Sequence, residues 1–199
     1  MNQLYVEFGY ASLPALGHNR SGDRLLVQRA PHHFAFLLID VAGHGDTASR
    51  VASSLSWPNV DVGEPPSSKA LLQHLHHQLA GSVGGAGLAA VFCLESRRFW
   101  HTSVGSVHLH HSRLGALESQ TGHLGVRERD LNEKSAFVES GDVLIACTDG
   151  VKNRGLAEHI GQLSGSAYMQ AGTLLQRQNK NHDDATVAIV RVGTKIVVG

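Results

Sequence analysis

FLLIDVAGHG, residues 36–45, is an apolar run that ends in an aspartate and passes directly into a glycine-rich turn. The run predicts a buried strand with Asp40 at its end. Three more aspartates stand at the edges of such runs: Asp149 closes 143–148, Asp183 precedes 185–192, and Asp23 opens 25–27. Burying a carboxylate without a counter-charge is costly. No basic residue is regularly spaced beside all four, so a shared pair of divalent cations is the simplest partner for them.

Strand patterns dominate on both sides of this stretch. The strands expected are 3–11, 24–29 and 34–40, with a hairpin at 31–33, then 88–94, 97–104 and 106–111, one or two short strands within 113–136, a strong strand at 143–148, and a last strand at 184–192 with an addition at 194–198. The glycine-rich segment 81–87 is expected to be a bend.

Helical spacing of apolar residues occurs in three places. The first helix follows residue 45, with Asp46 or Thr47 as N-cap, and Trp57-Pro58 is expected to stop it. The second is capped by Ser67 or Ser68. A helical turn is expected near 156–160 and a last helix near 165–178.

This order of elements predicts an α+β fold: an antiparallel β-sandwich flanked by helices in αββα layers. We find no linker that would divide residues 1–199, so a single domain is expected. Neighbouring antiparallel strands run in opposite directions. One rim would then hold Asp40 and Asp149, which end their strands, together with Asp183, which precedes the beginning of its strand.

Composition limits the classes of function. Lys+Arg and Asp+Glu both number 17, so no nucleic-acid or anionic-membrane partner is indicated. There is no signal-peptide pattern and no apolar run of membrane-spanning length. Cys93 and Cys147 lie in apolar runs and are expected to be buried free thiols of a reducing compartment, so a cytoplasmic location is expected.

Two other motifs have simpler explanations. The chain has 14 histidines, and the clusters at 74–77 and 108–111 raise the alternative of a zinc site. His108 and His110 share a strand face without a further ligand, and the helical cluster is explained by solvated positions. Residues 85–90 fit a dinucleotide-binding fingerprint by letter, but a helix precedes them and a strand follows, which is the reverse of what that motif needs.

Ligands that are only carboxylates favour hard ions such as Mg²⁺ or Mn²⁺ over zinc. Two such ions activate a shared water and neutralise phosphoryl oxygens, which suits hydrolysis of a phosphate ester. The alternative is that the aspartates are turn residues and helix caps, which are common at strand ends.

Four motifs, in order, resemble those of PPM-type (metal-dependent, type 2C) serine/threonine phosphatases, in their bacterial SpoIIE-like branch. The motifs are Ser21-Gly22-Asp23, Asp40-Val41-Ala42-Gly43-His44-Gly45, Thr148-Asp149-Gly150-Val151 and Asp183-Asp184-Ala185-Thr186. The short chain is most similar to the RsbX-like stressosome phosphatases of that branch.

The resemblance implies roles for individual residues. Asp40 would bridge two Mn²⁺ or Mg²⁺ ions, with the Val41 carbonyl as a further ligand to one of them. Asp149 and Asp183 would complete the other ion, and Asp23 would act on the first, directly or through water.

The motif neighbours have lesser roles by the same resemblance. Asp184 would be structural or lie behind the ligands, and His44 would orient water, act as a general acid or shape its loop. From their position near the motifs, and not from the resemblance, Arg20 and Arg154 are the choices among nearby cations for gripping a substrate phosphate; the alternative is that they are solvated surface charges.

The implied substrate is phosphoserine or phosphothreonine of a STAS-domain stressosome protein or anti-sigma-antagonist. The rival reading is a non-catalytic pseudo-phosphatase that binds such a partner. Such a module is expected to have lost at least one of the aspartates, and all of them are present.

Overall fold

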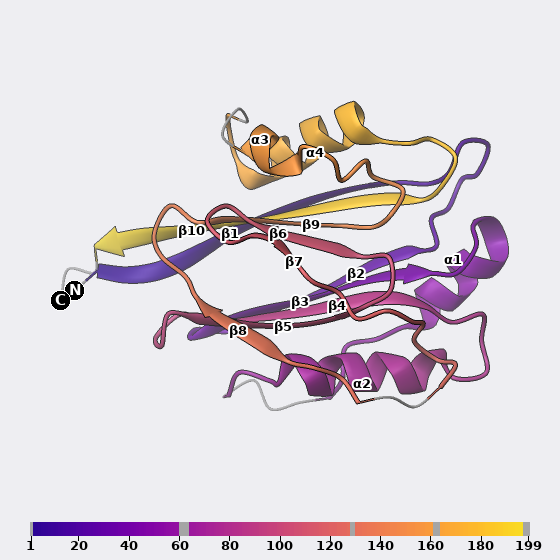
Figure 1. Cartoon of the computed structure of the whole chain (residues 1–199), viewed down its shortest axis with the longest axis horizontal. Coiled ribbons are helices and arrows are strands. Elements are labelled where there is room, and N and C mark those ends of the chain that lie inside the picture. The colour runs from indigo at the N-terminus through magenta and orange to yellow at the C-terminus, as the bar shows by residue number, and fades with distance from the viewer. Residues whose placement is uncertain (1, 60–63, 128–129, 161–163, 197–199) are drawn as a thin grey trace.

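The structure, a computed structural model, describes residues 2–59, 64–127, 130–160 and 164–196. Two five-stranded antiparallel sheets stack face to face, and helices cover both outer faces (Figure 1). The β1 sheet has the order β1 (Asn2–Leu13), β10 (Ala185–Ile196), β9 (Val143–Cys147), β6 (His108–His111), β7 (Gly115–Leu117). The β3 sheet has the order β2 (Asp23–Arg29), β3 (His33–Val41), β4 (Gly85–Cys93), β5 (Arg98–Val104), β8 (Lys134–Phe137). The predicted α+β sandwich is confirmed.

Each sheet has its own helices. α1 (Gly45–Ser54) and α2 (Ser68–Leu79) pack on the β3 sheet, while α3 (Leu156–Ile160) and α4 (Ala167–Gln178) pack on the β1 sheet. None of the helices within the described ranges is long and apolar enough to cross a membrane.

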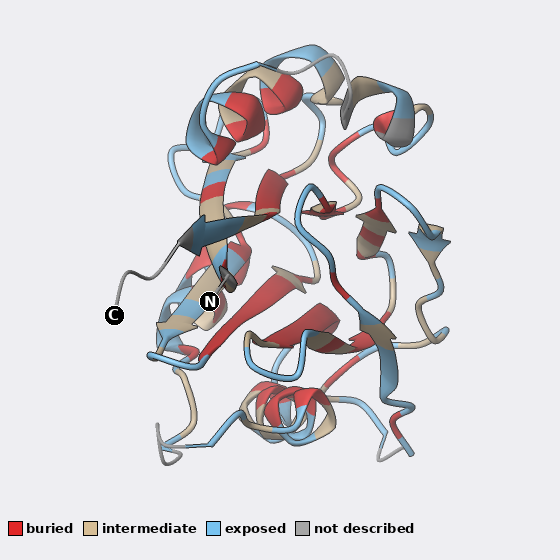
Figure 2. Cartoon of the chain, turned by 90° about the vertical axis from the view of Figure 1, so that its left-hand side faces the viewer, coloured by how far each residue is buried: buried red, intermediate tan, exposed pale blue. Residues whose placement is uncertain are grey.

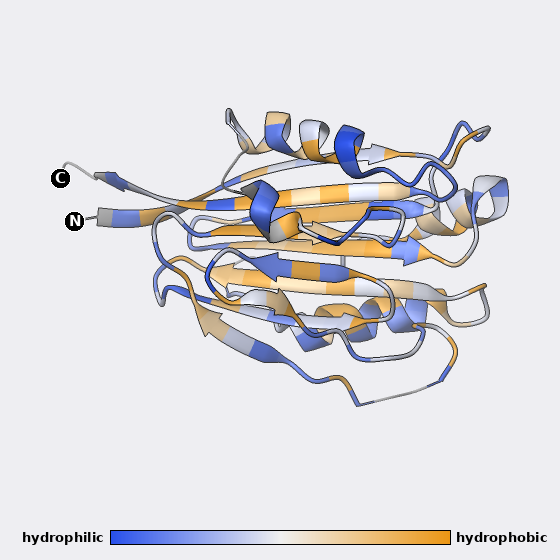
Figure 3. Ribbon diagram, turned by 45° about the horizontal axis from the view of Figure 1, so that its top comes forward, coloured by the Kyte–Doolittle hydropathy of each residue, from blue (hydrophilic) through white to orange (hydrophobic). Residues whose placement is uncertain are grey.

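Alternation along the strands separates the core into layers. In β3, Phe34, Phe36 and Leu38 face the space between the sheets, whereas Leu37 and Ile39 face α1 and α2. Figure 2 shows the buried residues along the inner strands and the inward faces of the helices, and Figure 3 shows hydrophobic residues along much of the long central strands. Alternate residues of a strand therefore face different layers: one set faces the space between the sheets, and the other set faces the helices.

Two predicted boundaries near α1 are wrong. The helix begins at Gly45 with His44 at the N-cap position, so neither Asp46 nor Thr47 caps it, and it ends at Ser54. The chain turns within three residues of β3, which brings the helix start forward. Leu55 ends the helix in an extended conformation because its buried side chain joins the core beneath α2.

The predicted bend at 81–87 is also partly wrong, because β4 already begins at Gly85. Gly85 pairs with Val41, and a Cβ on it would lie 2.3 Å from the Asp40 carbonyl oxygen. Only glycine allows the two strands to approach this closely. The segment with the dinucleotide-like letters is thus the first part of a strand.

The remaining differences are smaller. β6 begins at residue 108, two later than expected, after a turn at Gly105 (φ +86°). β10 is one continuous strand to residue 196, and 197–198 of the predicted addition lie outside the described residues. Ser67 caps α2, one of the two predicted caps, while Ser166 caps α4.

The cysteine and histidine predictions hold in part. Cys147 is buried, and burial raises the pKa of its thiol to about 12, but Cys93 is only half-buried. His77 is exposed as expected, whereas His76 is half-buried and accepts a hydrogen bond from the Gly125 N–H at Nδ1 (3.2 Å).

Two histidines lie inside the sandwich against one phenylalanine. The rings of His101 and His111 each stack on Phe99, with centroids 5.8 and 5.7 Å away. Burial lowers the pKa of His101 from 6.5 to about 4, and the Lys134 charge adds to the shift. A proton on His101 therefore favours the unfolded chain.

The variant His101→Phe should lose less stability in acid than the parent protein. Unfolded His101 takes up a proton near pH 6.5 and the folded residue only near 4, so its contribution is complete above 6.5 and is lost as pH falls between these values. At about pH 4.5 the difference in acid-induced loss should be roughly 2–3 kcal/mol. Urea unfolding at about pH 7.5 and 4.5 measures it, with exposed His77→Gln as control. Equal losses in parent and His101→Phe would contradict the assignment.

Candidate metal centre

Asp23 and Asp40 face each other at one end of the β3 sheet. They are directly opposite in the antiparallel register of β2 and β3. Asp23 lies on the same face of its strand as Leu25, and Asp40 on the same face as Leu38, and both leucines pack in the core between the sheets. Side chains directly opposite have Cβ atoms about 4.5–5.5 Å apart. Both carboxylates therefore point into the open end of the space between the sheets.

The β1 sheet brings Asp149 and Asp183 to the same end. β9 and β10 pair with Cys147 opposite Val187, so the end of one strand meets the beginning of the other. Gly150 makes the crossing possible, because a Cβ on it would lie 2.0 Å from the Asp184 carbonyl oxygen.

Three of the four aspartates share a cavity of about 260 Å³. Its lining residues are Asp40, Ala42, Gly43, His44, Gly85, Ala86, Ser106, His123, Asp149 and Asp183. The single rim predicted from the strand directions is therefore present. We call this cavity the carboxylate pocket.

Asp23 is buried beside this pocket and links the two sheets. Its Oδ2 accepts a hydrogen bond from Thr148 Oγ1 (2.8 Å), and Thr148 belongs to the other sheet. The Thr186 N–H donates to the same threonine oxygen (2.9 Å). Asp23 Oδ1 is buried without a hydrogen-bond partner among the described residues, which is an unusual state for a carboxylate oxygen.

The carboxylates disfavour each other's ionisation. Burial raises the pKa of Asp40 to about 8, and repulsion from Asp23, Asp149 and Asp183 adds to the shift. Burial likewise raises the pKa of Asp23 to about 7, and the nearby Thr186 and Thr148 side chains offset part of this rise. A bound cation would reverse this balance and release protons.

Asp184 has a different environment from its neighbour. Its carboxylate accepts hydrogen bonds from the backbone N–H groups of Ala15 (2.7 Å) and Gly22 (2.6 Å). It therefore holds both ends of the single loop between β1 and β2, in agreement with the structural role expected for it.

The donor set fits hard divalent cations. Three carboxylates converge on the pocket, and the buried Asp23 has an oxygen free for a further partner. Within the ranges that the structure describes, no three His, Cys, Asp or Glu side chains are drawn together tightly enough to hold an ion alone. Backbone oxygens and waters would complete the coordination, as is usual for Mg²⁺.

The structure separates the other predicted site residues. Val41 ends β3, directly after Asp40, and is buried. His44 is exposed and lines the pocket, with its ring 4.7 Å from that of His18. Arg20 and Arg154 are exposed and, in the described part of the chain, are not among the residues that line the carboxylate pocket.

Three polar residues near the carboxylates were not singled out from the sequence. Ser106 and His123 line the pocket, and Lys180 donates a hydrogen bond to the Asp149 backbone oxygen. Ser106 follows a glycine turn after β5, a weak signal. His123 and Lys180 carry none, because each lies in a loop without a motif.

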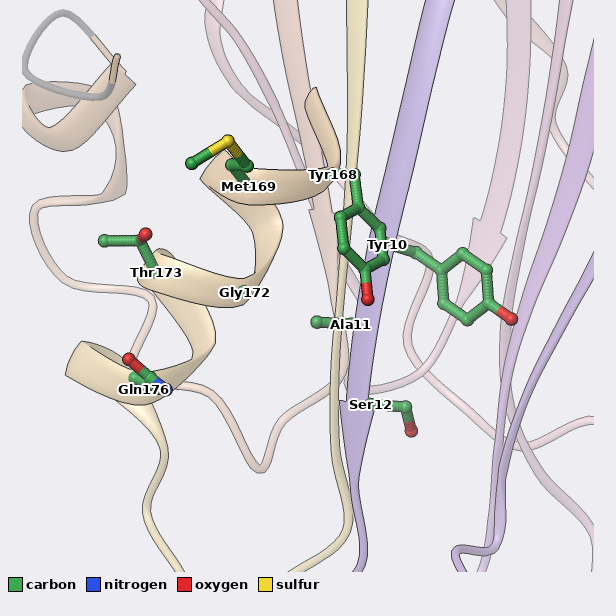
Figure 4. Close-up of a pocket in the computed structure, with 8 residues that line it drawn as sticks. All are labelled: Tyr10, Ala11, Ser12, Tyr168, Met169, Gly172, Thr173 and Gln176. Atoms are coloured by element: carbon green, nitrogen blue, oxygen red, sulfur yellow. The ribbon is translucent and has the colours of Figure 1, made fainter. Parts of the chain in front are cut away.

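A larger cavity of about 640 Å³ lies between β1 and α4 (Figure 4). Tyr10, Tyr168 and Met169 line it together with small and uncharged residues. Among the described residues its lining has no carboxylate, histidine, lysine or arginine, so its size does not make it a candidate metal centre.

No family model and no curated protein matches the chain. Solved structures do. RsbX in complex with magnesium has a TM-score of 0.80 and 18% identity, covering 97% of this chain and 100% of that chain. The PP2C phosphatase domain of SpoIIE from Bacillus subtilis, with a fragment of its regulatory domain, has a TM-score of 0.81 and 18% identity, covering 99% of this chain and 66% of that chain. A chain solved in connection with the bacterial stressosome has a TM-score of 0.80 and 20% identity, covering 94% of this chain and 100% of that chain.

These similarities show the fold. The chain has the PPM (PP2C) phosphatase fold, which it shares with RsbX and the SpoIIE phosphatase domain. The resemblance inferred from the four motifs is confirmed at this level.

Asp40→Asn should make the metal-free protein more stable and less responsive to metal. Because the folded pKa of Asp40 is about 8 against an ordinary 3.8, its stability cost grows as pH rises between these values. At about pH 8 the variant should therefore melt at a higher temperature than the parent protein in EDTA. Thermal melting with EDTA and with Mn²⁺ measures both effects. A parent protein that Mn²⁺ does not stabilise would contradict the assignment of this site.

Proposed function

We propose that this chain is a metal-dependent protein serine/threonine phosphatase that uses two Mn²⁺ or Mg²⁺ ions. The observation that supports this most is the shared pocket of Asp40, Asp149 and Asp183, next to the buried Asp23 with its unpaired oxygen. The similarity to RsbX in complex with magnesium supports the class of ion. Residues 1–199 are proposed to act as one phosphatase domain.

We assign the ligands as follows. Asp40 would be shared by the two ions and the Val41 carbonyl would be a further ligand to one of them, because this strand end lies at the pocket. Asp149 and Asp183 would hold the other ion. Asp23 would act on the first ion directly or through water, and its hydrogen bond from Thr148 fixes its orientation. When bound, the ions would supply an activated water and neutralise the phosphoryl oxygens.

The other residues of the site act on the substrate. His44, at the pocket wall, is proposed to orient the water or to protonate the departing serine or threonine oxygen. Arg20 lines a neighbouring cavity of about 400 Å³ with Asn19, Asp46 and Arg50. We propose that Arg20, together with Arg154, contacts the substrate phosphoprotein around the pocket.

The proposed substrate is the phosphoserine or phosphothreonine of a STAS-domain stressosome protein or an anti-sigma-antagonist, with the cytoplasm as the site of action. Similarity to RsbX and to a chain solved in connection with the stressosome supports this choice of partner.

Asp40→Asn should lower Mn²⁺-dependent phosphate release from a phosphoserine peptide by about a thousandfold or more, since the bridging charge is lost. Phosphate release with and without Mn²⁺ is the measurement, and circular dichroism checks the fold. The matched control is Asp130→Asn, which removes an exposed carboxylate paired with Lys69 and should keep parental activity. Equal phosphate release in EDTA and in Mn²⁺ would overturn the proposal.

A further inference from the structure

A second cavity, of about 410 Å³, adjoins the carboxylate pocket and shares His44 with it. The charges of its lining residues are opposite to those of the carboxylate pocket. The lining residues are Ala15, Leu16, His18, His44, Lys180, Asn181 and His182, with no acidic residue among them. We call it the histidine–lysine pocket.

Two loops that are far apart in sequence build this pocket. One follows β1 and the other precedes β10, and the Leu16 N–H donates to the Asn181 carbonyl across them (2.9 Å). Asp184 fixes the first loop through the Ala15 N–H. His18 then reaches the start of α1, where a Cβ on Gly45 would lie 2.8 Å from its Nδ1. The pocket wall is therefore tied to the same segments that carry the proposed metal ligands.

The pocket presents hydrogen-bond donors. An ammonium group has three donors and no acceptor, and Lys180 uses one of them for the Asp149 backbone oxygen. Within the described ranges no ion pair joins Lys180 to a carboxylate, although the residue is half-buried. His182 donates from Nδ1 to the Lys180 carbonyl (3.0 Å), which holds its ring beside the lysine. A half-buried cation that lacks an anion is a ready anchor for one.

We infer that the histidine–lysine pocket binds an anionic group that flanks the phosphorylated residue of the substrate. The inference rests on the proposed function and adds a substrate class to it: phosphoproteins with an acidic side chain or a second phosphoryl group next to the target. The transferred phosphoryl group belongs in the carboxylate pocket, where ions would offset the aspartates. The shared wall at His44 places the two groups side by side.

Binding can be tested apart from turnover. Three labelled peptides carry a non-hydrolysable phosphonate in place of phosphoserine and differ at the flanking position, which is glutamine, glutamate or phosphoserine. Fluorescence anisotropy in Mn²⁺ should give a Kd about tenfold lower for the glutamate peptide than for the glutamine peptide, as expected for one charge-assisted contact. If the phosphoserine peptide binds more tightly than the glutamate peptide, a second phosphoryl group is the preferred source of the anion. If the two peptides bind equally, a carboxylate is a sufficient source of it.

Lys180→Met and His18→Ala should each reduce this preference to about one- to threefold. His18 is exposed and makes no bond to a proposed metal ligand, so it tests the pocket if Lys180→Met perturbs Asp149. Lys195→Met removes the same charge at the opposite end of β10 and should keep the preference.

Parent protein that binds the glutamate and glutamine peptides equally, or a preference that survives both pocket variants, overturns the inference. Hydrolysis of the matching phosphopeptides, measured in parallel, separates the two proposals. Preference without hydrolysis defeats the phosphatase proposal and keeps the pocket, as a partner-binding module would require. Mn²⁺-dependent hydrolysis without a preference for the glutamate peptide supports the phosphatase proposal and defeats the inference about the histidine–lysine pocket.

Discussion

Repulsion among carboxylates at one end of the sandwich is the constraint on which this site depends. Asp40 and Asp23 lie opposite each other on neighbouring strands, and Asp149 and Asp183 approach them from the other sheet. Burial raises the pKa of Asp40 to about 8, and repulsion from these carboxylates adds to the shift. Divalent cations are the partners that turn such a destabilising cluster into a stable centre, because they offset several charges at once.

The sandwich holds these groups together against their repulsion. The apolar layer between the sheets fixes which side chains point inward, and the hydrogen bond from Thr148 to Asp23 joins the sheets at their open end. Gly150 lets the turn after Asp149 pass directly over Asp184. Asp184 in turn anchors the loop between β1 and β2 beside the site at both of its ends. The position of the pocket is thus a product of strand pairing and not of local loop structure.

Much of this could be predicted from the sequence. Period-two alternation and aspartates at strand edges were sufficient for the sandwich and for the common rim of Asp40, Asp149 and Asp183. Local boundaries were harder: the start of α1 depends on how quickly the chain turns after β3, and Gly85 belongs to a strand because it must approach Asp40 closely. Periodicity carries no information on either point.

The histidine–lysine pocket could not be predicted at all. Leu16 and Asn181 meet only because β1 pairs with β10, and neither loop has a motif. His101 shows a similar limit, since its place in a strand pattern does not reveal that it stacks on Phe99 inside the core. Pairings between distant segments decide both cases.

Electron paramagnetic resonance of the protein loaded with Mn²⁺ tests the central claim most directly. A pair of ions bridged by Asp40 should give the multiline spectrum of two coupled Mn²⁺ centres, and Asp40→Asn should abolish the coupling. A spectrum of isolated Mn²⁺ at every loading, or no bound Mn²⁺ at all, would contradict the account.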